Sequence, residues 1–291
     1  MIGTLGRLVQ GYRKLGDDIL VASKQVDDKL AKISELKVLR YQFRAIVRNT
    51  IGSEARTDAF APDVPAGGFV IFEKNLVEAR KAYEVAWKLR PDDSRTAAGF
   101  LGIEKAIGGE RAVMEKWFGL AMNADGDNRD ACLQKLDWLD PKWHGTAEEM
   151  LAFGHQCRDT KNWRAGITLL YCDSLLRMEG ILPPEERVGY LYKPEHWAGI
   201  KAVFDEYLAH FPSDDIVRSK YAVMCRLAVH PLEGHAQFEI LGDRLTQWPE
   251  IPYYPMETMK KMRENCRRAA ANEPRPAPKA DPKAQEVAKP K

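Results

Sequence analysis

The chain has 291 residues, enough for one large hydrophobic core or two modest ones. Its 44 lysines and arginines nearly balance 42 aspartates and glutamates, and a formal net charge of +2 excludes the strongly basic character of a typical nucleic-acid-binding protein. No apolar run approaches the roughly 18 residues of a membrane span, and the N-terminus lacks the apolar segment of a secretory signal. We therefore expect a cytoplasmic protein with no nucleic-acid partner and no membrane span.

Residues 1–49 predict an amphipathic helical segment. Apolar residues recur at steps of three and four from Leu5 to Ile33, as in a long helix or a coiled coil through which the chain binds itself or a partner. A second helical piece over 35–49 is more basic, with Lys37, Arg40, Arg44 and Arg48. A solvated helix face explains these charges. A patch that binds phosphate groups or a lipid surface is the alternative.

Residues 50–68 lose this periodicity and gain Gly, Pro and Ser, so we predict a linker and a domain boundary there. From 69 to 271 the sequence predicts one domain of successive helices, with no strand-like alternation. Residues 272–291 hold five prolines and five basic residues, which is typical of a disordered tail with polyproline II tendency. Clusters able to cap or break helices lie at 90–93, 123–127, 140–146, 158–162, 211–215 and 229–235.

A faint repeat runs through this domain. Pro91 and Asp125 occupy predicted turns 34 residues apart, and Trp163 and Trp197 have the same spacing, each expected to begin a helix. This is the tetratricopeptide period, although residues 179–195 interrupt it. We predict an all-α fold of tetratricopeptide-like helical hairpins stacked as a short irregular α-solenoid, with a long N-terminal helix and a disordered C-terminal tail.

The segments MEKWF (114–118) and LQKLDWLDPKWHGTAEEMLAF (133–153) carry a family resemblance. They resemble the bacterial domain of unknown function four-zero-three-four, whose members share a Leu-x-x-Leu-x-x-Lys-Trp-x-Gly-Ser/Thr-x-Glu-Glu-Met-type signature inside tetratricopeptide-like helices. The resemblance covers about residues 70–250 and is strongest at 142–150. It implies the helical fold and no activity, so it assigns no catalytic residue.

Residues 136–157 form the most distinctive stretch of the sequence, and they predict a joint between two helices. Pro141 ends the first helix, Gly145 is expected to take a positive φ, and Thr146 with Glu149 forms a capping box for the second. Trp143 would pack on Trp138 or on the next hairpin. A recognition loop in which Trp143 and His144 grip a peptide is the alternative.

Residues 179–195 place two tyrosines and three prolines in a predicted loop just before Trp197. Such a loop suits a binding lip, or it folds down on the core through its own tyrosines. We expect a non-enzymatic protein–protein interaction module or scaffold that binds a peptide or partner helix. The expected contact residues are Trp143, His144, Tyr190, Tyr192 and Trp197.

The alternative is a helical-domain enzyme or small-ligand binder with His144 and His155 in one pocket. No local spacing gives His144 a carboxylate or nucleophile partner, so we expect no catalytic residue. Five dispersed cysteines without a Cys-x-x-Cys pair indicate buried thiols rather than a disulfide framework. We also expect no cofactor and no metal.

Overall fold

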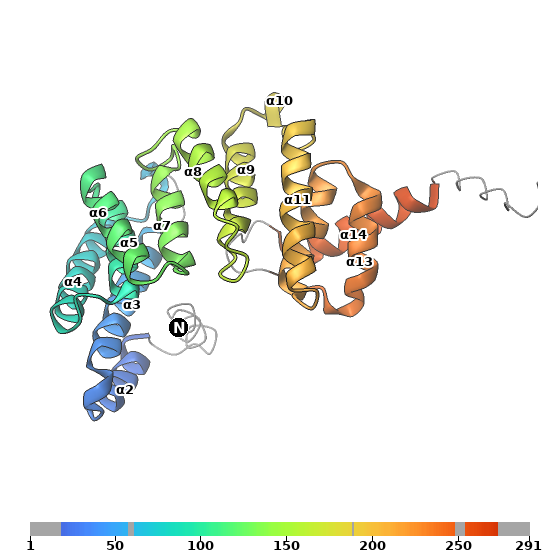
Figure 1. The fold of residues 1–291 in the computed structure, drawn as a ribbon. Coiled ribbons are helices and arrows are strands. Elements are labelled where there is room, and N and C mark those ends of the chain that lie inside the picture. The colour runs from blue at the N-terminus through green and yellow to red at the C-terminus, as the bar shows by residue number, and fades with distance from the viewer. Residues whose placement is uncertain (1–18, 58–60, 188, 248–253, 273–291) are drawn as a thin grey trace, which may run out of the picture. The chain divides into compact units, whose positions relative to one another are not determined.

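The computed structural model describes residues 19–57, 61–187, 189–247 and 254–272 (Figure 1). These residues form α-helices joined by turns and short 3₁₀ helices, with no β-strand among them. The all-α class expected from the sequence is thereby confirmed. The chain divides into two compact units, unit 1 (Met1–Leu182) and unit 2 (Pro183–Lys291).

Unit 1 consists of helices that pack on their neighbours in the sequence, and α5 and α9 each pack on α7 as well. Its 3₁₀ helices are η1 (Ser34–Leu36), η2 (Ala61–Asp63) and η3 (Ile167–Leu169). Its α-helices are α2 (Ile19–Ala31), α3 (Lys37–Arg56), α4 (Gly68–Leu89), α5 (Ser94–Ile107), α6 (Arg111–Ala124), α7 (Arg129–Leu139), α8 (Ala147–Asp159) and α9 (Leu170–Ile181).

Unit 2 is centred on α12, which packs against α11, α13 and α14. Gly234 on α13 permits close approach, because a Cβ there would lie 3.0 Å from Cys266 Sγ and 3.3 Å from Cys225 Cβ. The elements are α10 (Pro184–Arg187), α11 (Pro194–His210), α12 (Asp215–Leu227), α13 (Pro231–Leu241), η4 (Gly242–Arg244) and α14 (Met256–Asn272).

Capping side chains begin several helices where the sequence predicted turns. Asp93, Asn128 and Asp214 each accept a hydrogen bond from the backbone amide three residues on, which satisfies one of the orphan donors of α5, α7 and α12. Thr146 and Glu149 form the expected capping box at α8. Because these signals are local, they were readable from the sequence.

Two of these turns are also joined to each other. Asn128 Nδ2 donates to the carbonyl oxygen of Ser94 at 3.1 Å and to its Oγ at 2.5 Å. Ser94 Oγ in turn donates to the Ala121 carbonyl at 2.8 Å. Positions one predicted repeat apart therefore share hydrogen bonds, which ties the start of α5 to the start of α7.

An ion-pair network links α5, α7 and α9. Asp137 lies 3.0 Å from Lys105 Nζ and 2.5 Å from Arg177 Nη2, and Arg177 also lies 3.4 Å from Asp140. Burial raises the pKa of Asp137, but the two cations outweigh it and hold the pKa below its usual range. The network therefore favours the ionised carboxylate and connects three helices through one side chain.

The expected linker at 50–68 is wrong in part. α3 continues through Arg56, and α3 and α4 pack closely against each other rather than belonging to separate domains. Gly52 permits this contact, because a Cβ there would lie 3.2 Å from the Phe72 carbonyl oxygen. Gly52, which suggested a loop, is a helix-packing position. Along the chain, the boundary between the two compact units falls between residues 182 and 183 instead.

The N-terminal segment has the two helical pieces that the sequence predicted, in the part that the structure describes, and the second extends past residue 49 to Arg56. α2 ends at Ala31, η1 follows, and α3 begins at Lys37. The two helices pack against each other as a hairpin. Residues 3–18 of the predicted helix lie outside the described residues, and so does the predicted tail from 273 onward.

The two tryptophans of the faint repeat are not equivalent. Trp197 lies near the start of α11 as expected, but Trp163 lies in a turn, and α9 begins only at Leu170. The reason is Gly166, whose φ of 67° is left-handed and interrupts any helix that begins at Trp163. In α11, the corresponding Gly199 is helical.

Candidate partner-binding surfaces

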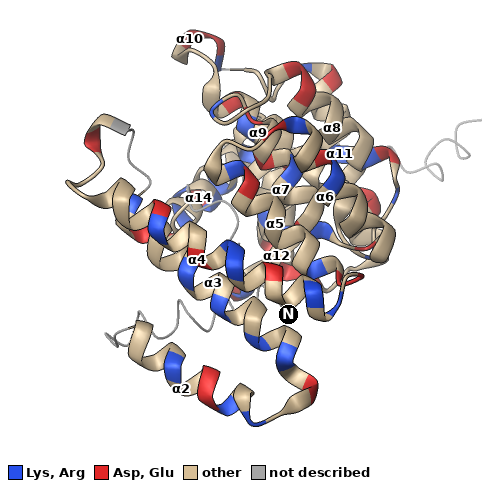
Figure 2. Ribbon diagram, turned by 90° about the vertical axis from the view of Figure 1, so that its left-hand side faces the viewer, with Lys and Arg blue, Asp and Glu red and all other residues tan. Residues whose placement is uncertain are grey.

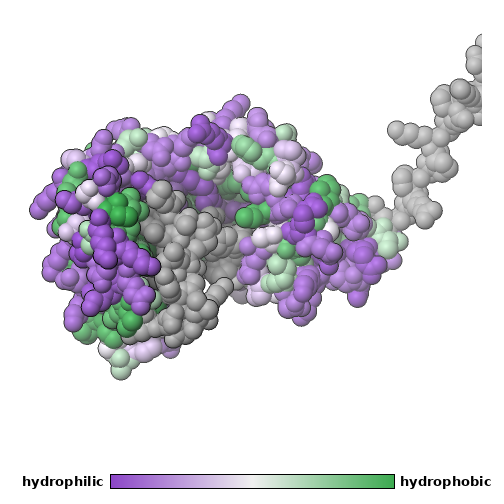
Figure 3. Space-filling model, turned by 90° about the horizontal axis from the view of Figure 1, so that it is seen from below, coloured by the Kyte–Doolittle hydropathy of each residue, from purple (hydrophilic) through white to green (hydrophobic). Residues whose placement is uncertain are grey.

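Exposed apolar side chains occur in both units. The face drawn in Figure 3 carries hydrophobic residues as separate patches among hydrophilic ones. The large apolar residues at least 45% exposed in the described part of the chain include Leu20, Val21, Val70 and Val77 in unit 1 and Tyr192, Ile216, Val229 and Ile240 in unit 2. Three of these, Leu20, Tyr192 and Val229, belong to the surfaces described next.

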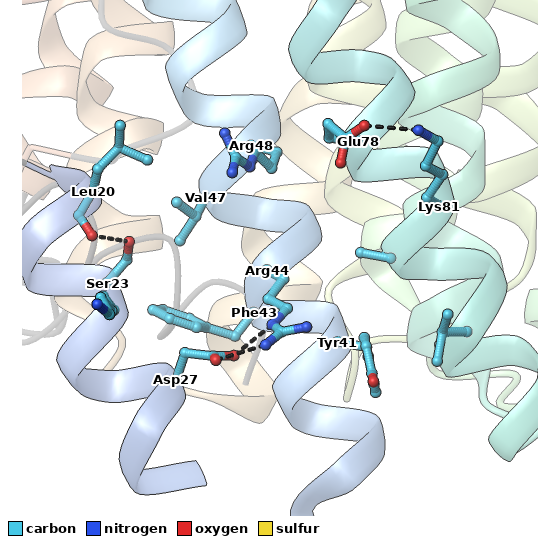
Figure 4. A pocket seen from close by; sticks show the side chains of 13 residues that line it. Leu20, Ser23, Asp27, Tyr41, Phe43, Arg44, Val47, Arg48, Glu78 and Lys81 are labelled. Atoms are coloured by element: carbon cyan, nitrogen blue, oxygen red, sulfur yellow. Dashed lines mark hydrogen bonds and ion pairs between the residues drawn. The ribbon is translucent and has the colours of Figure 1, made fainter. Parts of the chain in front are cut away.

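The first surface is a groove in unit 1 with a volume of about 490 Å³. It lies over α3, with α2 as one wall and α4 as the other (Figure 4). Phe43 and Val47 form a closed apolar floor, because they pack with residues of α2 such as Val26. The α2 wall presents Leu20, which is 48% exposed. We call this surface the α2–α4 groove.

One carboxylate of this groove is already neutralised. Asp27 accepts hydrogen bonds from Arg44 at 2.6 and 2.8 Å and from Arg40 at 3.0 and 2.8 Å. The Arg44 hydrogen bonds, together with those of Arg40, hold the pKa of Asp27 well below its usual range despite partial burial. This cluster fastens α2 to α3.

The remaining charges of the groove do not balance. Glu78 pairs with Lys81 at 2.8 Å, a hydrogen bond that lowers the pKa of Glu78. Lys24 and Arg48 form no ion pair with a carboxylate among the described residues; Arg48 reaches Asn75 Oδ1 at 3.5 Å, and its charge contributes to the lowered pKa of Glu78. Figure 2 shows lysines and arginines along α3 and α4 on this side of unit 1. The groove therefore has two cations that form no ion pair with a carboxylate among the described residues.

Trp143 and His144 lie in the joint between α7 and α8. The half-buried Trp143 ring has Lys105 Nζ 4.9 Å and the Arg56 guanidinium 5.8 Å from its centroid. His144 packs 5.0 Å from the buried Trp138 ring and donates through Nε2 to the Lys105 carbonyl at 2.7 Å. Both side chains thus bind the joint to α5, and a role in partner binding stays a prediction.

The expected positive φ at Gly145 is wrong, since Gly145 is not among the residues with a left-handed backbone. The glycine is required for another reason: a Cβ there would lie 2.2 Å from the Leu139 carbonyl oxygen and 2.5 Å from its Cα. Close backbone approach at the joint, rather than conformational freedom, explains this residue.

In unit 2, Tyr190 is only 7% exposed and so does not form part of a lip. Its ring packs 4.4 Å from the His196 ring, and His196 Nδ1 donates to the Tyr190 carbonyl at 2.7 Å. The segment before α11 therefore folds down on the core of unit 2 through Tyr190, which is buried. Tyr190 is therefore corrected from a contact residue to a core residue.

Tyr192 and Trp197 are brought together by a residue that the sequence did not single out as a contact. Tyr192 is 54% exposed, and its ring lies 5.7 Å from that of His230. The Trp197 ring stacks on the same His230 ring, with the two centroids 3.9 Å apart and an angle of 10° between the ring planes. Val229 and Leu232, beside His230, are 56% and 36% exposed. These five residues define the Tyr192 patch.

The histidines of the alternative interpretation have separate surroundings. His155 packs 5.1 Å from the Tyr171 ring, whereas His144 binds Trp138 and Lys105. Neither lines the α2–α4 groove. Within the described ranges, no three His, Cys, Asp or Glu residues are placed to hold a metal ion.

The cysteines are buried free thiols, as the sequence predicted. Cys132 and Cys157 share a hydrogen bond between α7 and α8, which lowers the pKa of Cys132 and, with burial, raises that of Cys157. None of the described helices is long and apolar enough to cross a membrane.

Comparison with protein-family models, with curated proteins and with solved structures gave no match. The case for a function therefore rests on the residues and geometry of this chain.

Proposed function

We propose that this chain is a non-enzymatic interaction module whose α2–α4 groove binds an acidic amphipathic helix of a partner protein. The proposal includes a tetratricopeptide-like stack of hairpins in unit 1, as the family resemblance implies. Two contacts support that stack: the Ser94–Asn128 hydrogen bonds at the repeat spacing, and the Asp137 network across α5, α7 and α9. Stacked hairpins of this kind serve as partner-binding scaffolds in other proteins.

The observation that carries the proposal is the pair Lys24 on α2 and Arg48 on α3, which line the groove and form no ion pair with a carboxylate among the described residues. A helix laid into a groove presents residues at i, i+3, i+4 and i+7 to it. One carboxylate of such a helix would meet Lys24, another would meet Arg48, and an apolar residue between them would cover Leu20. Charge-assisted hydrogen bonds are the strong ones, so these contacts select an acidic helix over a basic one.

The test is photo-crosslinking in the cells that make the full chain. A photoreactive amino acid in place of Ser23, which lines the groove, should capture a partner through an acidic helical segment identified by mass spectrometry. The same amino acid in place of Lys29, which is on α2 but does not line the groove, is the control. Equal capture at both positions, or capture only of segments without carboxylates, overturns the proposal.

The affinity of the chain for the captured segment then tests the proposal quantitatively. Two charge-assisted contacts of about 1.5 kcal/mol each correspond to roughly 100-fold in affinity, so the double variant Lys24→Glu with Arg48→Glu should lose at least that factor. Lys29→Glu should leave affinity unchanged within about twofold. Binding of anionic lipid vesicles that the same double variant abolishes, without any captured protein, would assign the groove to a membrane surface instead.

A further inference from the structure

The Tyr192 patch in unit 2 has exposed apolar side chains and a tyrosine hydroxyl that no described residue binds. Tyr192 exposes more than half of its surface at the end of a row of three rings, and Val229, the residue before His230 in the chain, is also exposed. The Tyr192 hydroxyl has no hydrogen-bond partner among the described residues. Tyrosines at binding surfaces combine an apolar ring with a polar group in this way.

The patch carries one partly exposed carboxylate. Glu233 lies in the first turn of α13, with Oε1 3.8 Å from His230 Nδ1, and its side chain is 40% exposed. Lys193, next to Tyr192 in the chain, is turned toward the Tyr190 ring, with Nζ 5.2 Å from its centroid. The Glu233 carboxylate is therefore available at the patch to a basic ligand.

We propose that the chain's own C-terminal segment, residues 273–291, docks on the Tyr192 patch. This segment follows α14 in the same unit and holds five prolines and five basic residues against three carboxylates. Proline-rich segments dock on aromatic surfaces with little loss of conformational entropy, because the polyproline II conformation is preformed. The basic residues of the segment match the Glu233 carboxylate.

The length of the segment permits this contact. Its 19 residues span about 59 Å in a polyproline II conformation, at about 3.1 Å per residue. A compact unit of about 90 residues has a radius of gyration of only about 12 Å. Pro290, 18 residues beyond the end of α14, therefore reaches any point on the surface of unit 2, whereas Pro282, ten residues beyond it, reaches points within about 31 Å of that end. This inference is independent of the α2–α4 groove.

Photo-crosslinking within the full chain tests the proposal. A photoreactive amino acid in place of Val287 should crosslink to the segments that contain Tyr192 and Val229, in a product that migrates as a single chain. Tyr192→Ala should reduce this product at least fivefold. Phe69→Ala, which removes a 40%-exposed aromatic side chain from unit 1, should leave it unchanged.

A second variant separates proline recognition from charge. Replacing Pro282 and Pro290 by serine keeps every charge of the segment and should also reduce the product at least threefold. Crosslinks scattered over the surface, or insensitive to Tyr192→Ala, overturn the proposal. Crosslinks that join two chains overturn docking within one chain and assign the patch to self-association.

Discussion

The sequence offered aromatic residues of both the α7–α8 joint and the Tyr192 segment as expected contacts, and in the structure the two regions differ in how far those residues are covered. At the joint, Trp143 is covered by two cations and His144 donates to a backbone carbonyl. At the patch, Tyr190 is satisfied locally while Tyr192 remains exposed and without a hydrogen-bond partner among the described residues. An aromatic residue in a loop indicates binding only when the fold leaves it unsatisfied.

The largest expected effect at the joint comes from Gly145→Ala. The new Cβ would meet the Leu139 backbone at 2.2 Å, and backbone cannot move aside as a flexible side chain can. We expect the free energy of unfolding in urea to fall by about 3 kcal/mol, at the upper end of overpacking effects. Gly126→Ala is the control, because nothing lies within 4 Å of its Cβ. Equal stability of the two variants would contradict the close approach at the joint.

The next largest effect should come from Asp137→Asn. We expect the free energy of unfolding to fall by about 2 kcal/mol at pH 7, because this substitution removes a carboxylate held between two partly buried cations. The pKa of Asp137 is lowered in the fold, so its contribution is complete above the unfolded pKa of about 3.9 and is lost as the pH falls further. The stability difference from the parent chain should therefore narrow below about pH 4.

The surface pair of Asp159 with Arg158 offers a control for this network. Asp159 is 65% exposed, and Asp159→Asn should change the free energy of unfolding by less than about 0.5 kcal/mol. If the difference in the free energy of unfolding between Asp137→Asn and the parent chain stays constant from pH 7 to pH 3, Asp137 contributes through its packing rather than through its charge.

Trp143→Ala tests the covered aromatic of the comparison. It removes a half-buried ring and its contacts with Lys105 and Arg56, so we expect a loss of about 1.5 kcal/mol in urea unfolding. Partner capture through the α2–α4 groove should be unaffected once the variant is folded. A variant as stable as the parent chain that no longer captures the partner would restore Trp143 as a contact residue.

Tyr192→Ala should have the smallest effect on stability, within about 0.5 kcal/mol, because the side chain is mostly exposed. Thermal and urea unfolding measure this directly. A loss as large as that of Trp143→Ala would mean that the Tyr192 ring is part of the core of unit 2, and the contrast between the two regions would disappear.

Local signals in the sequence predicted the parts of the fold that local interactions decide. The caps Asp93, Thr146 and Asp214 act within three residues and lie in the predicted clusters, whereas the cap of α7, Asn128, lies one residue past the cluster at 123–127. Glycines were ambiguous, because a missing Cβ serves a turn at Gly166 but helix packing at Gly52. Sequence alone does not distinguish the two uses.

The surfaces depend on contacts between distant residues, and this limited their prediction. The basic residues Arg44 and Arg48 stood out in the sequence, but only the fold shows that Arg44 donates to Asp27 while Arg48 forms no ion pair with a carboxylate of the described residues. Likewise, His230 joins Tyr192 and Trp197 from another helix boundary, more than 30 residues along the chain.

The attachment of α2 has a consequence for how occupancy of the groove could be observed. α2 packs chiefly on α3, held by Asp27 and its two arginines, and it is also one wall of the groove. Undocking of α2 and loss of the groove are thus one equilibrium, and a ligand that requires the groove stabilises the docked helix by RT ln(1 + [L]/Kd). Amide hydrogen exchange in α2 would slow by the factor 1 + [L]/Kd, so this helix is a built-in reporter of binding.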